Sequence, residues 1–276
     1  MKSNNTLTLN DSVVMPRLGF GLFQVSDHDA ETMTLEAFKV GYRSIDSARI
    51  YQNESGLGRA LAKTELKRDE MFITTKLWND DQGYDKALKA FDTSMAKLGI
   101  EKLDLYLVHW PSPQRNLYSE SWKALIELQK QGRVKSIGVS NFTKEHLQRI
   151  IDETGHVPAV NQIELHPSFQ QKDLRAFHAK HGIVTESWSP LGQGKAISDP
   201  TIAAIAKKHG KTPAQVILRW HIENDLVVIP KSVTPSRIRE NFQVFDFKLD
   251  ADDLGLIDRL DSAKGRIGPD PQTAAF

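Results

Sequence analysis

Residues 71–110 read MFITTKLWNDDQGYDKALKAFDTSMAKLGIEKLDLYLVHW, and this stretch contains the unit from which the fold is built. The apolar runs at 71–76 and 103–110 have the length of buried β-strands. Between them, apolar residues recur at intervals of three, four and three positions: Leu88, Phe91, Met95 and Leu98. This spacing places one apolar stripe on a helix, which would pack against a sheet. A strand, a helix and a second strand in this order predict a parallel βαβ unit.

The same alternation continues in both directions along the chain. It gives eight candidate strands, at residues 18–21, 42–46, 71–76, 103–110, 134–141, 159–164, 183–187 and 226–230. Two helix starts are marked by a side-chain acceptor at the N-cap and a proline after it, at Thr212-Pro213 and Thr234-Pro235. Eight strands, each followed by a helix, predict that residues 1–276 form one α/β domain, a (β/α)8 TIM barrel. An open, doubly wound sheet is the alternative.

Both ends of the chain lie outside this repeat. Residues 6–15 alternate in polarity around an Asn-Asp turn, which predicts an N-terminal β-hairpin that would cap the bottom of the barrel. The segment 265–276 contains Pro269, Pro271 and two glycines, so we expect it to be irregular.

The composition excludes several classes of function. The 276 residues include 36 Lys and Arg, 35 Asp and Glu and no cysteine. A net charge of +1 lacks the basic excess that binds a phosphate backbone, so nucleic acid is not an expected partner. Without cysteine, redox chemistry has to come from a cofactor. The sequence has no membrane span and no signal-peptide core, so we expect a cytoplasmic protein without membrane contact.

Four side chains are unusual at the strand ends, where the active sites of such barrels form. Asp46 ends the second strand and Tyr51 lies in the loop after it, while Lys76 ends the third strand and His109 closes the fourth. A buried ammonium is costly unless it is paired, and Asp46 on the neighbouring strand is the available partner for Lys76. A cation beside Tyr51 would lower the pKa of this phenol and suit it to donate a proton to a carbonyl oxygen.

Each of these residues also has a structural interpretation. Lys76 and Asp46 could form a structural ion pair, Tyr51 could face solvent, and His109 could be a hydrogen-bonded core histidine. The convergence of all four on the first half of the rim favours the catalytic interpretation.

Other catalytic motifs are absent from the sequence. Gly19-Phe20-Gly21 lacks the third glycine of GxGxxG, and there is no P-loop, GxSxG elbow or HExxH helix. His178 and His181 have helical spacing, but beside Lys180 they predict a solvated helix face rather than a metal site. We therefore expect no metal.

The second half of the rim carries amides and hydroxyls that suit a neutral ring with a carboxamide. They are Ser140, Asn141, Gln162, Trp188 and Ser189. After the eighth strand, IPKSVTPSRIREN at residues 229–241 places two or three cations and two hydroxyls at a helix start. The helix dipole, the N–H groups and the charge together predict an anion site. The alternative is a capped surface helix with solvated basic residues.

Three segments resemble the signature sequences of the aldo-keto reductases. They are GYRSIDSARIYQNE at 41–54, LDLYLVHWP at 103–111 and IPKSVTPSRIREN at 229–241, in this order across essentially the whole chain. The resemblance implies a (β/α)8 barrel that binds NADPH without a Rossmann domain and reduces aldehydes and ketones to alcohols. It implies that Tyr51 is the general acid and that Lys76 and Asp46 tune and hold it. His109 would orient the substrate carbonyl.

The same resemblance implies the residues that bind the cofactor. They are Gly21, Ser140, Asn141, Gln162, Trp188, Ser189, Leu191, Lys231, Ser232, Val233, Thr234, Arg237, Glu240 and Asn241. Lys231, Ser232 and Arg237 would take the 2′-phosphate, which favours NADPH over NADH because Lys and Arg pair with phosphate. Glu240 and Asn241 would lie at the adenine.

Two departures from the family pattern bear on the site. Many members place tyrosine where this chain has Trp188, which would stack on the nicotinamide. The loop at 110–116 and the tail are short compared with steroid-handling members, which disfavours a bulky hydrophobic substrate.

Within the family, ITTKLWND at 73–80, residues 157–167 and ESWSPLGQGK at 186–195 are most similar to bacterial 2,5-diketo-D-gluconate reductases. This similarity implies small polar carbonyl substrates such as 2,5-diketo-D-gluconate or methylglyoxal. Phe23, Trp78 and Trp110 would form the walls of the substrate pocket, and Gln193 would add a polar contact. By resemblance we expect a monomer.

Two other classes of function remain as alternatives. A cofactor-binding redox sensor or regulatory subunit with the same barrel would bind NADPH without turning it over. A metal-dependent barrel hydrolase would require a divalent metal and would not respond to NADPH.

Overall fold

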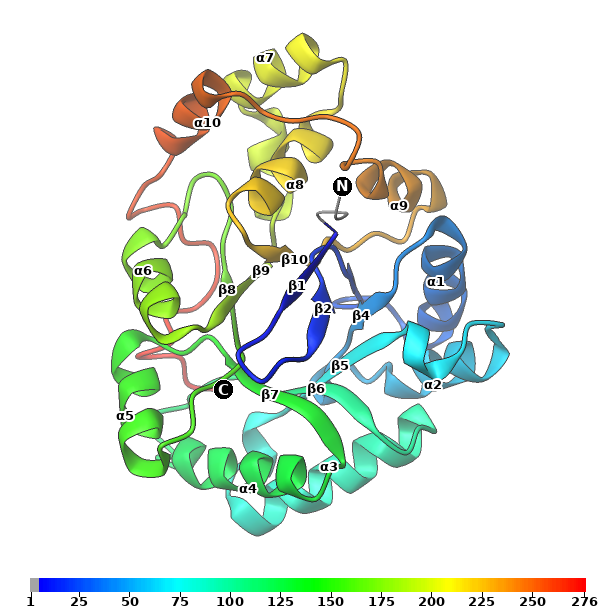
Figure 1. The fold of residues 1–276 in the computed structure, drawn as a ribbon, viewed down its shortest axis with the longest axis vertical. Coiled ribbons are helices and arrows are strands. Elements are labelled where there is room, and N and C mark those ends of the chain that lie inside the picture. Colours follow the sequence, from blue (N-terminus) through cyan, green and yellow to red (C-terminus); the bar gives the residue numbers. More distant parts are fainter. Residues whose placement is uncertain (1–4) are drawn as a thin grey trace.

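Eight parallel strands form one sheet in which each strand pairs with the next along the chain (Figure 1). The computed structural model describes residues 5–276. The strands are β3 (Phe20–Gly21), β4 (Ser44–Asp46), β5 (Phe72–Leu77), β6 (Leu103–Val108), β7 (Val134–Ser140), β8 (Val160–Glu164), β9 (Val184–Trp188) and β10 (Val227–Val228). The sheet closes because the backbone N–H of Gly19 donates to Val228 and that of Gly21 donates to Pro230. The predicted (β/α)8 barrel is confirmed, and the open-sheet alternative is wrong.

Helices surround the barrel (Figure 1). They are α1 (Asp27–Val40), α2 (Glu54–Lys63), α3 (Tyr84–Leu98), α4 (Tyr118–Lys130), α5 (Lys144–Thr154), α6 (Lys172–His181), α7 (Pro200–His209), α8 (Pro213–Glu223), α9 (Pro235–Phe242) and α10 (Ala251–Asp258). In α3, Phe91, Met95 and Leu98 of the predicted stripe are buried, and Leu88 is half-buried. The main core therefore lies between the helices and the outer face of the barrel.

Several strands are shorter than predicted. Leu18 makes only an isolated bridge with Val228, before the paired residues of β3. β6 ends at Val108, so His109 and Trp110 follow the strand. β10 contains only Val227–Val228, and Pro230, two residues beyond its end, has no N–H to contribute to a ladder. The shortened C-terminal ends of β6 and β10 lead into loops that carry candidate site residues.

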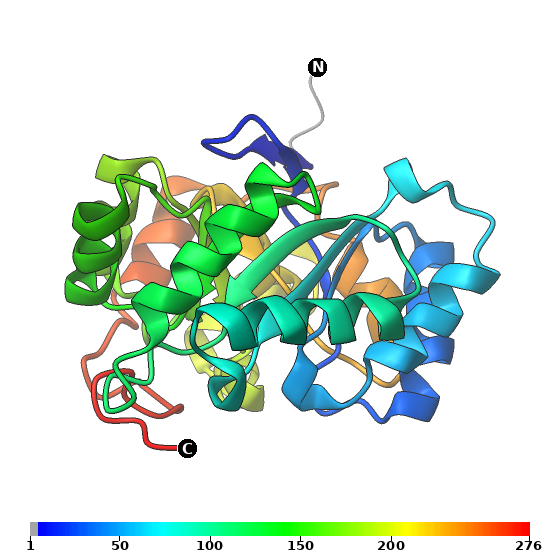
Figure 2. The same ribbon diagram turned by 90° about the horizontal axis from the view of Figure 1, so that it is seen from below.

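The N-terminal hairpin covers one end of the barrel, and the C-terminal segment lies at the other (Figure 2). Its strands are β1 (Thr6–Thr8) and β2 (Val14–Pro16), which pair antiparallel. Leu9 and Met15 are buried in a cluster with Leu105 and Leu107 of β6. Because strand side chains alternate, Leu105 and Leu107 face the barrel interior. The predicted cap at the bottom is therefore present, and the opposite end is left for a site.

The two helix starts marked by proline differ in their capping. Before α8, the Thr212 hydroxyl accepts from the Gln215 N–H, and the Gln215 side chain accepts from the Thr212 N–H. Before α9, Thr234 is the N-cap residue and Pro235 follows it, as predicted, but the Thr234 side chain makes no capping hydrogen bond. The Thr234 backbone N–H instead donates to the Ser232 hydroxyl, 3.1 Å away, which turns the chain before the helix begins.

No helix within residues 5–276 is long and apolar enough to cross a membrane.

Candidate active site

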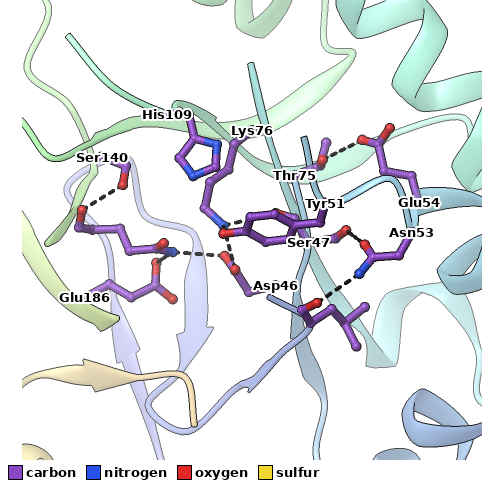
Figure 3. A network of polar contacts seen from close by, with 12 residues as sticks. Asp46, Ser47, Tyr51, Asn53, Glu54, Thr75, Lys76, His109, Ser140 and Glu186 are labelled. Carbon is purple, nitrogen blue, oxygen red and sulfur yellow. Dashed lines mark hydrogen bonds and ion pairs between the residues drawn. The ribbon is translucent and has the colours of Figure 1, made fainter. Parts of the chain in front are cut away.

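Polar side chains converge inside the barrel at the end opposite the hairpin. Asp46, Lys76, Gln162 and Glu186 come from four strands, β4, β5, β8 and β9, and all four are buried. Their direction follows from strand alternation, which turns every second residue inward. Figure 3 shows Asp46, Lys76 and Tyr51 meeting at one point, with Glu186 beside Asp46. The barrel therefore brings polar and charged side chains from four strands into one buried cluster.

The Lys76 ammonium is fully buried, and Asp46 compensates its charge. Its Nζ donates to Asp46 Oδ1 at 2.5 Å and to the Ser47 carbonyl at 3.0 Å. Burial acts to lower the pKa of Lys76, but attraction to Asp46 and Tyr51 outweighs it, so the pKa lies above its ordinary value. Removing one partner of such a pair costs about 3–5 kcal/mol. The predicted Lys76 and Asp46 pair is present and holds a charged lysine.

Tyr51 ends a short 3-10 helix, η1 (Arg49–Tyr51), beyond β4. Its hydroxyl lies 3.4 Å from Lys76 Nζ, as the predicted contact requires. Loss of hydration raises the pKa of Tyr51, and the Lys76 charge offsets this only in part. The expected lowering of the Tyr51 pKa is wrong in this structure, because the phenol is desolvated as well as close to a cation. Tyr51 therefore carries its proton at neutral pH.

The loop that presents Tyr51 is fixed by Asn53. The Asn53 amide donates to the carbonyls of Leu22 and Val25 at 2.8 and 2.9 Å, and its oxygen accepts from the Ser47 hydroxyl at 2.8 Å. Asn53 is fully buried. Three well-formed bonds to a buried amide thus hold the loop against the strands, which limits the positions available to Tyr51.

His109 closes the other side of the cluster. Its ring lies 5.6 Å from the ring of Tyr51 and 5.3 Å from that of Trp78, edge-on to both. Burial, together with the nearby charge of Lys76, holds the pKa of His109 well below its ordinary value, so the imidazole is neutral. Its Nδ1 has no hydrogen-bond partner among residues 5–276. The ring as a whole is a neutral imidazole next to Tyr51, and such a ring can hydrogen-bond a ligand oxygen.

The amide and hydroxyl side chains predicted on the second half of the rim form hydrogen bonds with other residues of the protein. Asn141 follows β7 in the left-handed region at φ 62°, which asparagine adopts more readily than most residues. Its Nδ2 donates to the His109 carbonyl at 3.0 Å, and its Oδ1 accepts from the Trp188 indole N–H at 2.8 Å. Ser140 donates to the Gln162 carbonyl at 2.8 Å. The indole therefore makes a bond to Asn141 through an N–H that tyrosine lacks.

The end of β3 and the loop after β9 carry other predicted residues. A Cβ at Gly21 would lie 3.0 Å from the Ile229 carbonyl oxygen, so a small residue fits there. Ser189 and Leu191 are half-buried after β9, and Ser189 has φ 48°. Gln193 is exposed and lies in the short 3-10 helix Gly192–Gly194 after β9.

The predicted anion site surrounds the start of α9. Lys231, Val233, Thr234 and Arg237 are exposed, while Ser232 is buried. None of the ion pairs between residues 5–276 involves Lys231 or Arg237. Two uncompensated cations beside a helix N-terminus suit a bound anion.

The two residues predicted at the adenine lie further along α9. Glu240 Oε1 accepts from the Thr212 hydroxyl at 2.9 Å, and Asn241 is buried. Glu240 therefore also joins α9 to the start of α8.

Aromatic side chains surround the approach to Tyr51 and His109. The Phe23 ring is half-exposed and lies 5.2 Å from that of Tyr51. Phe276, which was not predicted, stacks on Trp78 at 5.8 Å and meets Trp110 edge-on at 5.0 Å. Phe23 therefore lies beside Tyr51 and Trp78 beside His109, while Phe276 of the C-terminal segment contacts both Trp78 and Trp110.

The C-terminal segment is irregular, as predicted, but it is anchored to the barrel. The Glu164 carboxylate on β8 accepts from the backbone N–H groups of Ile267 and Gly268, at 2.6 and 2.8 Å. A Cβ at Gly268 would lie 2.5 Å from the Trp188 ring, so only glycine allows this approach. His166 supplies a third hydrogen bond to Glu164, at 3.1 Å. The segment is therefore part of the site.

Glu164 and Glu186 were missed at the level of sequence, although a signal was present. Glu186 stands two residues before Trp188, and Glu164 stands two after Gln162. Alternation puts each carboxylate on the same inward face as a predicted site residue. A charged residue at an inward position of a buried strand is as anomalous as Lys76.

The histidines of α6 do not form the predicted solvated face. His178 is buried, where it contacts Asn161 at 2.9 Å and the Thr185 hydroxyl at 2.8 Å. Burial lowers the pKa of His178 to about 3, so it is a neutral core residue. His181 stacks on Phe177 instead. No cluster of three or more His, Asp or Glu side chains within residues 5–276 is placed to hold a metal ion.

Comparison with known proteins places this barrel in a family. The profile of the Aldo/keto reductase family matches residues 17–262. The chain is 55% identical over 273 residues to the methylglyoxal reductase DkgA of Escherichia coli (strain K12), and 98% of each protein is covered. It is 54% identical over 270 residues to an aldo-keto reductase of Mycolicibacterium smegmatis, also with 98% of each covered.

A solved structure agrees with this placement. A mutant of Gox0644 in complex with NADPH has a TM-score of 0.95 and 54% identity, covering 98% of both chains. The chain belongs to the aldo/keto reductase family. The resemblance described from the sequence is thus confirmed, together with the predicted enzyme class, an oxidoreductase.

The anchor of the C-terminal segment should titrate below the ordinary glutamate range. Burial acts to raise the pKa of Glu164, but the bonds from His166, Ile267 and Gly268 outweigh it, so its pKa is lowered. A lowered pKa contributes stability at neutral pH that is lost only as the pH falls through the lowered value. We expect the amide NMR signals of Ile267 and Gly268 to stay constant through the ordinary glutamate range and to shift only below it.

In Glu164→Gln the same two amide signals should differ from wild type at neutral pH and should no longer titrate with acid. Signals that follow an unshifted glutamate pKa in the wild-type protein would contradict the anchor.

Proposed function

We propose that this protein reduces small aldehydes and ketones to alcohols, with NADPH as the hydride donor and Tyr51 as the proton donor. The observation that carries the proposal is the buried Lys76 and Asp46 pair beside the Tyr51 hydroxyl, at the open end of an aldo/keto reductase barrel. General acid catalysis requires a donor within reach of the substrate and a means to stabilise the anion it leaves. Tyr51 and Lys76 have this relation.

The side chains of the cluster have distinct tasks in this proposal. Tyr51 gives its proton to the carbonyl oxygen, and the Lys76 ammonium stabilises the phenolate that remains. Asp46 holds Lys76 in place. The neutral His109 binds the same carbonyl oxygen and orients it toward Tyr51. Bound NADPH supplies the hydride to the carbonyl carbon, so that hydride and proton together give the alcohol.

The rim residues fit this cofactor. The uncompensated cations Lys231 and Arg237 suit the 2′-phosphate, because a guanidinium or ammonium pairs strongly with a phosphate. The His109 ring lies 5.6 Å from the Tyr51 ring, so both side chains can reach one carbonyl oxygen bound beside them. The solved NADPH complex of a protein 54% identical supports the same cofactor. Trp188 would cover the nicotinamide, and Ser140, Asn141 and Gln162 would hold its carboxamide.

The substrate class is small and polar. Phe23, Trp78 and Trp110 leave an aromatic approach that the C-terminal segment narrows through Phe276. Two relatives named as methylglyoxal reductases, both more than 50% identical, support a small dicarbonyl as substrate. We propose methylglyoxal first and 2,5-diketo-D-gluconate second.

Turnover should distinguish this enzyme from a redox sensor. We expect NADPH oxidation, followed by near-ultraviolet absorbance, with methylglyoxal or 2,5-diketo-D-gluconate and little with a steroid ketone. Tight NADPH binding by fluorescence, with no carbonyl reduced, would instead support the sensor alternative.

Removing only the Tyr51 hydroxyl should remove the proton donor. We expect Tyr51→Phe to lower kcat by about 10²–10⁴-fold, the usual contribution of a general acid, with NADPH affinity retained. The measurement is steady-state methylglyoxal reduction, with NADPH binding followed by fluorescence. Tyr84→Phe on the exposed face of α3 is the matched control and should behave as wild type. Wild-type turnover in Tyr51→Phe would contradict the assignment.

Removing both rim cations should affect NADPH more than NADH. We expect Lys231→Ala with Arg237→Ala to weaken NADPH by about 100-fold or more, since each charged hydrogen bond contributes about 1.5–3 kcal/mol. NADH lacks the 2′-phosphate and should change little. Binding titrations with both cofactors test this, with the exposed Lys207→Ala as the control. Equal weakening of both cofactors would rule out the 2′-phosphate role.

A further inference from the structure

A second buried carboxyl group adjoins the catalytic cluster. Glu186 of β9 is 1% exposed. The Gln162 side-chain nitrogen donates one hydrogen bond to Glu186 Oε2 at 2.8 Å and another to Asp46 Oδ2 at 2.9 Å. The Asp46 carboxylate, which is paired with Lys76, only accepts, so its contact fixes which end of the Gln162 amide is the nitrogen. Figure 3 shows Glu186 and Asp46 on the same side of Lys76.

In this cluster the Lys76 ammonium faces two carboxyl groups, those of Asp46 and Glu186. The charged or titratable groups that act on Glu186 come from two neighbouring strands and η1: Asp46 from β4, Lys76 from β5 and Tyr51 from η1. The two strands that flank β9 contribute only neutral residues, Gln162 from β8 and Val227 from β10. Two ionised carboxylates would leave a net negative charge in a buried site, which is costly. Burial and the charge of Asp46 raise the pKa of Glu186 to about 8. Glu186 therefore holds a proton at neutral pH.

We propose that Glu186 is a positioning residue of the reaction: it clamps the Gln162 amide against Asp46, and so fixes the carboxylate that holds Lys76 beside Tyr51. The inference rests on the proposed role of Tyr51 as proton donor. Glu186 touches neither the phenol nor the substrate in this account. It acts by contact through Gln162 and Asp46, and by the effect of its charge on the Tyr51 phenol.

The charge of Glu186 has a consequence for Tyr51. A neutral Glu186 leaves the Lys76 ammonium balanced by Asp46 alone, with its attraction available to the phenolate. An ionised Glu186 adds repulsion against both Asp46 and a phenolate, which opposes proton release from Tyr51. Turnover should therefore fall as Glu186 loses its proton.

The test compares two variants at Glu186 across neutral and alkaline pH. Glu186→Gln keeps an oxygen that accepts from Gln162 and cannot ionise. We expect it to retain kcat at neutral pH within about threefold and to lack the alkaline fall of wild type near pH 8. Glu186→Leu removes the clamp, and we expect kcat to fall by about tenfold or more, because small misplacements of catalytic groups are costly.

A matched control is Glu54→Gln. Glu54 is equally buried, but it accepts from Thr75 on the outer face of β5 and does not contact the cluster. It should keep the wild-type pH profile. Thermal unfolding of all variants separates misfolding from a catalytic effect, and Glu186→Gln alone decides the matter if Glu186→Leu does not fold.

Two results would overturn the inference. One is a Glu186→Gln profile with the same alkaline fall as wild type, and the other is a wild-type profile with no fall near pH 8. Tyr51→Phe measured in parallel keeps the two proposals apart. If Tyr51→Phe is inactive while Glu186→Gln matches wild type, only the role of Glu186 fails. If Tyr51→Phe turns over normally, the proposed function itself fails.

Discussion

The buried ion pair between Lys76 and Asp46 is the constraint on which the candidate site depends. An ammonium inside a barrel is tolerated only where a carboxylate and further acceptors surround it. Asp46 on the adjacent strand and the Ser47 carbonyl meet this need. The pair in turn brings the Tyr51 hydroxyl to a cation and brings Gln162 to Asp46. Its low-dielectric surroundings also explain why the nearby histidine is neutral and why a second carboxyl holds its proton.

The two ends of the barrel have different roles: apolar side chains fill one end, and the other end carries the candidate site. The same alternation of side chains that buries Leu105 and Leu107 under the hairpin places His109 at the opposite rim. The hairpin closes the apolar end and the C-terminal segment borders the polar one (Figure 2). Glu164 anchors that segment, and the close approach of Gly268 to Trp188 couples it to the cofactor side of the site.

Much of this arrangement was predictable from local patterns. The eight strands, the hairpin and the pairing of Lys76 with Asp46 followed from periodicity and from the cost of an unpaired buried charge. Strand ends were predicted less well, because ladder pairing at the rim depends on how neighbouring strands diverge. His178 was misjudged because helical spacing alone does not tell which face of α6 meets the sheet.

The sequence by itself determined the class of fold, the family and the chemical types at the rim, since these depend on spacing and composition within single segments. Only the tertiary structure decided the contacts that cross the barrel. These include the hydrogen bonds of Gln162 to two carboxyl groups, the indole bond from Trp188 to Asn141 and the docking of the C-terminal segment. The protonation states of Tyr51 and His109 were decided there as well. The physical reason is that desolvation and charge coupling depend on distances between strands far apart in sequence, and local patterns carry no such distances.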